Sequence, residues 1–234
     1  MDKKQAKVAL DKIIRQIFGV ENPLSLEQAV KKFTFDIYLP NKVKDYTDGS
    51  TTWSASASAS RFVKMENARN NEASPTKGLY ATQPIKDLKD ILSKWNGINA
   101  ITTEFVVDGI NVAESDMVEE SENVFHSRDI FRSKDIYYSD NIHDSEFVFA
   151  SQSGGPLTFC IRAEDSGQCA NSFGITRSGG LTDCLMMHDC GDMQDSMFCS
   201  NISGYRFCIA NMQFEEAEYR RLREEVVRWI LTPQ

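Results

Sequence analysis

The sequence lacks the features that define several large classes of protein. It has no apolar run approaching the roughly eighteen residues of a membrane span, and it opens on Asp2, Lys3, Lys4 and Gln5 instead of a basic segment followed by an apolar one. Neither membrane insertion nor secretion is therefore expected. Lys and Arg number 26 against 34 Asp and Glu, giving a net charge of -8, whereas proteins that neutralise nucleic-acid phosphates carry clustered positive charge. We expect no nucleic-acid partner.

Motifs for catalysis and cofactor binding are missing as well. The chain contains no P-loop, dinucleotide fingerprint, H-E-x-x-H motif or nucleophile elbow. None of its six cysteines forms a C-x-x-C pair. Cys184, His188 and Cys190 lie close together in the sequence, but residues six apart on one repeating column, such as the two cysteines, would not converge on a metal. We assign no catalytic residue, cofactor or metal, and expect reduced, buried thiols that behave as small apolar side chains.

The N-terminal part has an α/β pattern. Apolar residues at helical spacing predict an amphipathic helix over residues 3 to 18, which Gly19 ends. A capping box from Ser25 to Gln28 predicts a second helix to about Phe33. Alternation of apolar and polar residues from 33 to 39 then predicts a half-buried strand that stops at Pro40.

Residues 41–77 have no such periodicity and predict a long flexible loop, which either wraps a neighbour or is simply solvated. Apolar residues at helical spacing, among them Leu88, Ile91 and Trp95, then predict another helix, which ends at Asn96-Gly97. We place the boundary of this N-terminal α/β region at 1–104.

A six-residue repeat dominates the rest of the chain. Serines recur at every sixth position from Ser121 to Ser151, and a second series at the same spacing contains only small, β-branched or thiol side chains. Many residues just before the second series are Asp or Asn, which suit corners because their side chains tolerate turn conformations. The second series comprises Val106, Val112, Val118, Val124, Ile130, Ile136, Ile142, Val148, Gly154, Cys160, Ser166, Ser172, Ser178, Cys184, Cys190, Ser196, Ile202 and Cys208.

A short period with a small inward residue predicts a β-solenoid over residues 105–213. Gly155, Gly167, Gly179 and Gly191 recur every twelve residues, which favours two unlike faces and twelve residues per coil; three faces and eighteen residues are the alternative. Helical spacing resumes in 214–234 and predicts a C-terminal helix that caps the open end. The expected fold is thus mainly β with an α/β N-terminal region.

The segment from Phe207 to Tyr219 matches a closing pattern C-I-x-N-x-Q-[FY]-x-x-x-E-Y. Together with the hexads, this segment resembles uncharacterised Cys- or Ser-rich hexad-repeat proteins of marine tailed phages and small-genome bacteria. Many of the bacterial proteins place Cys where this chain has Ser121 to Ser151. The resemblance covers the second half strongly, carries no catalytic residues, and implies a virion-associated structural protein.

Five residues are candidates for an interaction surface, because each follows an inward residue of the repeat and an exposed row of this kind would bind a partner. If the same residues pack against helices, they are core. These residues are Phe125, Phe131, Tyr137, His143 and Phe149.

The sequence predicts a non-enzymatic structural or attachment protein, specifically a capsid-surface or tail component of a tailed phage. It would be made in the host cytoplasm and located in the virion, with copies of itself or capsid and tail neighbours as partners. A cytosolic adaptor using the aromatic row is one alternative. A hexapeptide-type acyltransferase with His143 or His188 at a subunit seam is another, although the bulky residues after the inward positions disfavour it.

Overall fold

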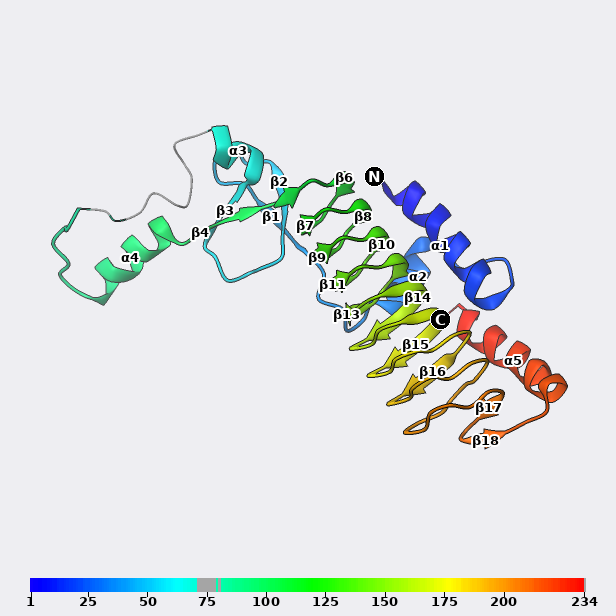
Figure 1. Ribbon diagram of the computed structural model, residues 1–234. Helices are drawn as coiled ribbons and strands as arrows, with labels where there is room; N and C mark the ends of the chain where they lie inside the picture. The colour runs from blue at the N-terminus through cyan, green and yellow to red at the C-terminus, as the bar shows by residue number, and fades with distance from the viewer. Residues whose placement is uncertain (71–78, 80, 234) are drawn as a thin grey trace.

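The computed structural model describes residues 1–70, 79 and 81–233. A β-solenoid forms the long body, helices α1, α2 and α5 lie along one side of it, and a smaller arm that carries α4 extends from its N-terminal end (Figure 1). The prediction of a mainly β solenoid with N-terminal helices and a C-terminal helix is confirmed.

Parallel strands build the solenoid, and each residue pairs with the one twelve positions ahead. Val106 pairs with Val118, Ile136 pairs with Val148, and the same spacing continues to the bridge between Met197 and Ile209. Twelve residues per coil is therefore confirmed, and eighteen is excluded. The strands are β5 (Val106–Val107), β6 (Ile110–Ala113), β7 (Asp116–Glu119), β8 (Glu122–Phe125), β9 (Arg128–Phe131), β10 (Lys134–Tyr137), β11 (Asp140–His143), β12 (Glu146–Phe149), β13 (Gln152–Gly154), β14 (Leu157–Glu164), β15 (Cys169–Thr176) and β16 (Leu185–His188).

The coil closes because the backbone bends at every third residue. Asn123, His126 and Asp129 have φ of 58°, 50° and 57°, and this left-handed pattern repeats along the solenoid. Asn and Asp are among the residues that enter this region most easily. The sequence predicted Asp and Asn at corners of the coil; Asn123 lies within β8 and provides one of the four bends per coil.

Bends at every third residue give four inward columns, twice the number expected. The two predicted columns carry bulky side chains as far as Val148, while serines fill the two additional columns; from Leu157 onward the arrangement reverses. Each layer thus keeps a mixture of small and bulky residues, as close packing requires. The additional columns contain Gly109, Ser121, Ser133, Ser145, Leu157, Cys169, Leu181 and Met193 in one, and Ser115, Ser127, Ser139, Ser151, Ala163, Ile175, Met187 and Cys199 in the other.

The buried serines form hydrogen-bonded ladders through the interior. The Oγ of Ser139 donates to the carbonyl of Tyr137 at 2.9 Å and accepts from the N–H of Ser151 at 3.2 Å. The N–H of Ser139 donates in turn to Ser127 Oγ at 3.0 Å. Each hydroxyl therefore satisfies one backbone N–H that strand pairing leaves free, and its own proton goes to a carbonyl that also accepts a backbone N–H from the next coil, such as that of Ala150 at Tyr137. This is the reason that these columns are polar although they are buried.

Replacing Ser139 by Ala should lower the free energy of unfolding by about 1–3 kcal/mol, because the N–H of Ser151 loses its acceptor in the interior and the carbonyl of Tyr137 loses one of its two donors. Urea denaturation measures the effect. Ser139→Cys should cost less, since Cys169 in the other column already donates its thiol to the carbonyl of Gly167 at 3.2 Å. The matched control is Ser203→Ala at an exposed position, for which we expect no change. An equal loss in Ser139→Ala and Ser203→Ala would contradict the ladder's role.

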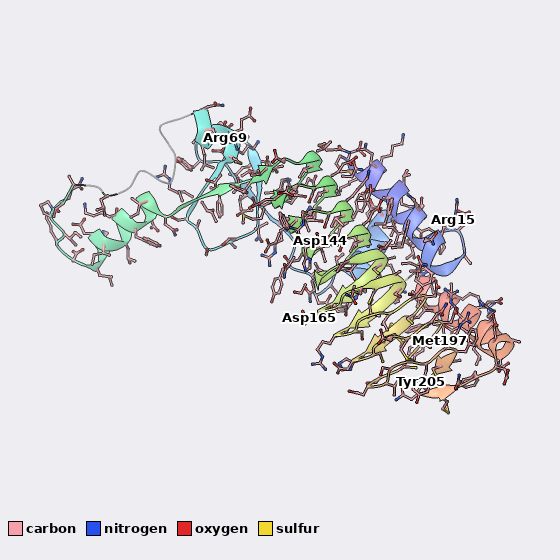
Figure 2. The ribbon with its side chains drawn as sticks, in the orientation of Figure 1. Arg15, Arg69, Asp144, Asp165, Met197 and Tyr205 are labelled. Atoms are coloured by element: carbon pink, nitrogen blue, oxygen red, sulfur yellow. The ribbon has the colours of Figure 1, made fainter. Side chains whose placement is uncertain are left out.

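Three helices cover one face of the solenoid. The two predicted N-terminal helices are confirmed as α1 (Lys3–Phe18) and α2 (Leu26–Phe33), the latter with the predicted capping box. The C-terminal helix is α5 (Glu216–Leu231); it packs along the flank of the last coils rather than across the open end, because its apolar residues face the same row of solenoid side chains as α1 does. Figure 2 shows Met197 on this side and Asp165 on the opposite edge.

The end of the solenoid is completed by a short hairpin of β17 (Cys208–Ile209) and β18 (Met212–Gln213). The side chain of Asn211 accepts from the N–H of Ser200 and donates to its carbonyl, both at 2.9 Å. Asn211 thereby replaces the strand that the next coil would have supplied. The closing pattern noted in the sequence is thus an end cap.

Two sequence predictions in the N-terminal region were wrong. No strand forms over residues 33 to 39: Phe33 completes the buried face of α2, and Phe35 lies exposed beneath the guanidinium of Arg162. Residues 41 to 70 are not a loop, because polar side chains such as Asp45, which accepts from the N–H of Lys64 at 2.8 Å, hold short strands together. Residues 71–77 of the predicted loop lie outside the described residues.

The arm that replaces the predicted loop consists of small elements before the first coil. Its members are β1 (Asn41–Lys44), β2 (Thr51–Ser54), β3 (Arg61–Lys64), α3 (Met65–Asn70), α4 (Leu88–Ile98) and β4 (Ala100–Thr103). β1 and β2 pair antiparallel, β3 and β4 pair parallel, and β4 leads directly into the solenoid. The chain passes from the arm into the solenoid between β4 and β5, whereas α1 and α2 pack against the solenoid and contribute to its core.

Candidate interaction surface

The five residues proposed from the sequence do not form one row. Phe125, Tyr137 and Phe149 lie in the column that α1, α2 and α5 cover, and each is at most 2% exposed. Phe131 and His143 belong to the strands of the opposite face, which none of the described helices covers. The first three are core and are inaccessible to a partner in this arrangement. The five candidates divide between two faces because residues six positions apart lie on alternate faces of a twelve-residue coil.

The open face carries ion pairs between adjacent coils. Arg128 contacts Asp140 through two hydrogen bonds of 2.8 and 2.9 Å, and Arg132 contacts Asp144 in the same manner. His143 is exposed and lies beside Asp144, which is labelled on this edge in Figure 2. Because each of these Arg–Asp pairs joins residues twelve apart, both link successive coils, and with rigid strands beneath them they give this face a fixed charge pattern.

The cysteines and histidines are not gathered into a reactive centre in the described part of the chain, where no group of His, Cys, Asp and Glu is arranged to hold a metal. All six cysteines are free and buried, and burial raises the pKa of Cys160 and of Cys184 to about 12. Such thiols stay protonated and inert. His188 is exposed and contacts Arg177 and Asp189, so it lies outside the column that holds Cys184.

Helix α4 presents the most conspicuous apolar surface in the described residues. None of its side chains is buried. Leu88 is 67% exposed and Trp95 is 53% exposed, and the other apolar residues on this side are also solvent-accessible. The stripe comprises Ile85, Leu88, Ile91, Leu92, Trp95 and Ile98. A contiguous apolar patch of this kind marks a contact with another molecule.

The arm holds α4 away from the solenoid by its C-terminal end. Ser60 Oγ donates to the carbonyls of Asn96 and Asn99, and Arg61 donates to the carbonyl of Gly97. Figure 1 shows α4 at the far end of the arm from the coils. The helix was predicted from its periodicity, but nothing in the sequence distinguishes its apolar face from an ordinary core face, so the sequence alone did not indicate a site there.

A buried carboxylate fixes the base of the arm to the first coils. Asp116 is 1% exposed, accepts from the N–H of Ala55 at 2.7 Å, and accepts from the N–H of Phe105 at 2.8 Å. Burial raises the pKa of Asp116. Arg128 adds a hydrogen bond of 2.6 Å to the carbonyl of Ala55. The direction in which the arm leaves the solenoid is therefore set by specific contacts.

In the described residues, no helix combines the length and the apolar character that crossing a bilayer requires. Comparison of the chain with family models, curated proteins and solved structures finds no match.

Proposed function

We propose that this protein is a non-enzymatic structural or attachment component of a larger assembly. The solenoid serves as the rigid body, and the apolar stripe of α4 contacts a neighbouring molecule. The observation that carries the proposal is this stripe, which lies on a helix at the end of an arm and which the described part of the chain leaves exposed. Burial of such a surface in a contact is favourable by roughly 25 cal/mol per Å² of apolar area.

The design of the solenoid supports the same proposal. Its interior is filled by packed side chains and serine ladders, and its open face is fixed by ion pairs between coils, so both serve rigidity. A rigid solenoid with one projecting helix that makes a contact is suited to hold other components of an assembly at a fixed distance from each other. The resemblance of its hexads to those of phage proteins supports the virion of a tailed phage as the setting, with synthesis in the host cytoplasm.

Quantitative mass spectrometry of purified particles from the source tests this proposal. We expect the protein at a copy number in whole-number proportion to a known structural subunit, and we expect it to stay with the particles through a density gradient. A non-structural protein of the same host lysate serves as the control for carry-over. Absence from washed particles would contradict the virion assignment and favour a cytosolic adaptor.

A further inference from the structure

We infer that the N-terminal end of the solenoid binds an extended, basic segment of another protein, which adds a strand to the exposed edge of β6. The inference goes beyond the proposed function, because the contact is made by the solenoid and does not involve α4. Three observations carry it: backbone groups at this edge have no partner strand in the described part of the chain, two apolar columns are open above the first coil, and the surrounding side chains are acidic.

The two ends of the solenoid are finished differently. At the C-terminal end, the side chain of Asn211 makes both backbone hydrogen bonds that a further coil would make with Ser200. At the N-terminal end, β5 and β6 are the outermost strands of the described sheet, and β6 pairs with β8 alone. The chain before β5 leaves the solenoid and forms the arm, where β4 pairs with β3. The first coil therefore presents an uncovered strand edge, and such an edge can pair with another chain.

Hydrogen bonds in the later coils identify the N–H groups that lack a partner in the first coil. At a bend, the N–H donates to the carbonyl thirteen positions earlier, as His126 does to Ala113 at 3.1 Å. Asp108 and Glu114 are bends of the first coil, with φ of 50° and 53°, and the residues thirteen positions earlier lie in α4 and β4. Neither N–H has an acceptor among the described residues. The first coil therefore offers two free donors on its outer side.

The same edge offers hydrogen-bond acceptors. The carbonyl of Ser121 accepts from the N–H of Ile110 in the preceding coil, at 2.9 Å. Gly109 occupies the position of Ser121 in the first coil, before which the described chain has no other coil, so its carbonyl faces the open end. Beside it, the side chain of Asn111 accepts from the amino group of Met1, and a cationic donor thus already lies at this edge. An extended peptide is the ligand that complements a series of backbone donors and acceptors.

Two apolar columns are open above the same edge. Val118 and Val124 are 0% exposed, whereas Val106 and Val112, which precede them in the two columns, are partly exposed. Ile110 is 66% exposed beside them. In the later coils, each column is covered by the coil before. A bound strand with β-branched side chains over the two open columns would cover them in the same way, and burial of this apolar area favours binding.

The side chains around this end carry negative charge. Residues 104–127 contain seven Asp and Glu residues and no Lys or Arg. Asp108 and Glu120 are exposed at one corner of this end. Neither forms an ion pair among the described residues, since Arg132 in the following coil is paired with Asp144. This charge favours a strand that carries Lys or Arg over a neutral or acidic one.

One coil of this chain has the features that the proposed ligand requires. Residues 128–139 place two isoleucines in the apolar columns and carry three basic side chains against two acidic ones. In the solenoid, Arg132 pairs with Asp144 in the next coil. Asp108 occupies the column of Asp144. A peptide of this sequence, added before the first coil in the same register, would therefore bring its Arg132 over Asp108.

Titration of the full-length protein with the synthetic peptide of residues 128–139 tests the inference. A contact of this size is weak, so we expect saturable binding with a Kd of about 100 µM at low ionic strength. At saturation, NMR should show slower hydrogen exchange of the Asp108 and Glu114 amides, with the central coils unchanged. The matched control is the same peptide with N-methyl groups at alternate residues. It keeps every side chain but loses backbone donors, so it should bind about tenfold more weakly.

Charge reversal tests the register. Asp108→Arg should weaken binding severalfold, because it places two guanidinium groups opposite each other; the backbone tolerates Arg there, since Arg132 in the same column has φ of 43°. A peptide with Arg132→Glu should bind the Asp108→Arg protein more tightly than the original peptide does. Asp165→Arg makes the same change at an exposed position of a later coil, and it should bind as the wild type does. Circular dichroism of each variant verifies that the solenoid is folded.

Several results would overturn the inference. Absence of binding at millimolar peptide would do so, as would equal binding of the N-methylated peptide, which would indicate attraction between side chains alone. Equal affinity of Asp108→Arg and Asp165→Arg would contradict the expected register. Self-association of the protein alone, abolished by Asp108→Arg, would assign the edge to a second copy of this chain instead. The mass-spectrometric test of the proposed function does not depend on any of these results.

Discussion

Gly154→Val should destabilise the solenoid by about 1–3 kcal/mol, although valine or isoleucine occupies each of the four preceding positions of the same column, which are Val106, Val118, Ile130 and Ile142. A Cβ on Gly154 would lie 3.0 Å from the Cδ1 of Leu157 and 3.1 Å from the carbonyl oxygen of Ser166. The site is crowded because the bulky side chains change columns in this layer. Overpacking, rather than any polar effect, is the cause of the expected loss.

Leu157→Ser alone should cost about 2–5 kcal/mol, since it removes a fully buried leucine and leaves a cavity. The double variant Gly154→Val/Leu157→Ser recreates the arrangement of Ile142 and Ser145 in the preceding coil. We expect it to be more stable than the sum of the single effects predicts, by at least 1 kcal/mol. Urea denaturation of the four proteins gives this coupling energy. If the effects of the two single substitutions on stability simply add, the result would contradict the explanation that a bulky side chain in one inward column occupies the space left by a small side chain in the next.

Asp116→Ala should release the base of the arm. Its carboxylate is the buried acceptor for the amides of Ala55, just after β2, and of Phe105, between β4 and β5, so its loss leaves both unpaired, at about 1–3 kcal/mol for each. Hydrogen exchange followed by mass spectrometry should show much faster exchange in β2 and β3 than in the wild type, with the central coils unchanged. Asp116→Asn should have an intermediate effect, because an amide group offers one acceptor oxygen in place of two.

Glu119→Ala provides the control for this experiment. Glu119 lies in the same strand, β7, and its side chain is partly exposed. We expect its removal to leave exchange in the arm unchanged. Equal protection of β2 in wild type and Asp116→Ala would mean that other contacts, such as the hydrogen bond of 3.3 Å from Glu104 N–H to the carbonyl of Trp53, hold the arm in place.

The solenoid could be predicted from sequence because its period is strict and every coil repeats the same backbone. The predicted columns at every sixth residue are correct, yet half of the inward positions were overlooked. Ser121 and Ser127 were noted only as a spacing, because serine is ordinarily exposed and gives no apolar signal. Their burial follows from hydrogen bonds to backbone groups twelve residues away, and these depend on the coil length, which the sequence left open.

The arm could not be predicted, for a different physical reason. Its strands are four residues long, and their stability depends on isolated polar contacts such as those of Asp45 and Asp116, which leave no periodic trace. The helix α4 was correctly predicted from its apolar spacing. Periodicity states which face of a helix is apolar but not whether the same chain covers it, so the exposed stripe required the structure.

Site-specific photo-crosslinking within assembled particles tests most directly whether α4 joins this protein to a neighbour. A photoreactive amino acid replaces Leu92 in one variant and Asn141, which is exposed on the open face of the solenoid, in another. Our account predicts a discrete crosslinked product from position 92, which mass spectrometry identifies as a segment of one neighbouring molecule, and little product from position 141. Efficient crosslinking from position 141 with none from position 92 would contradict it.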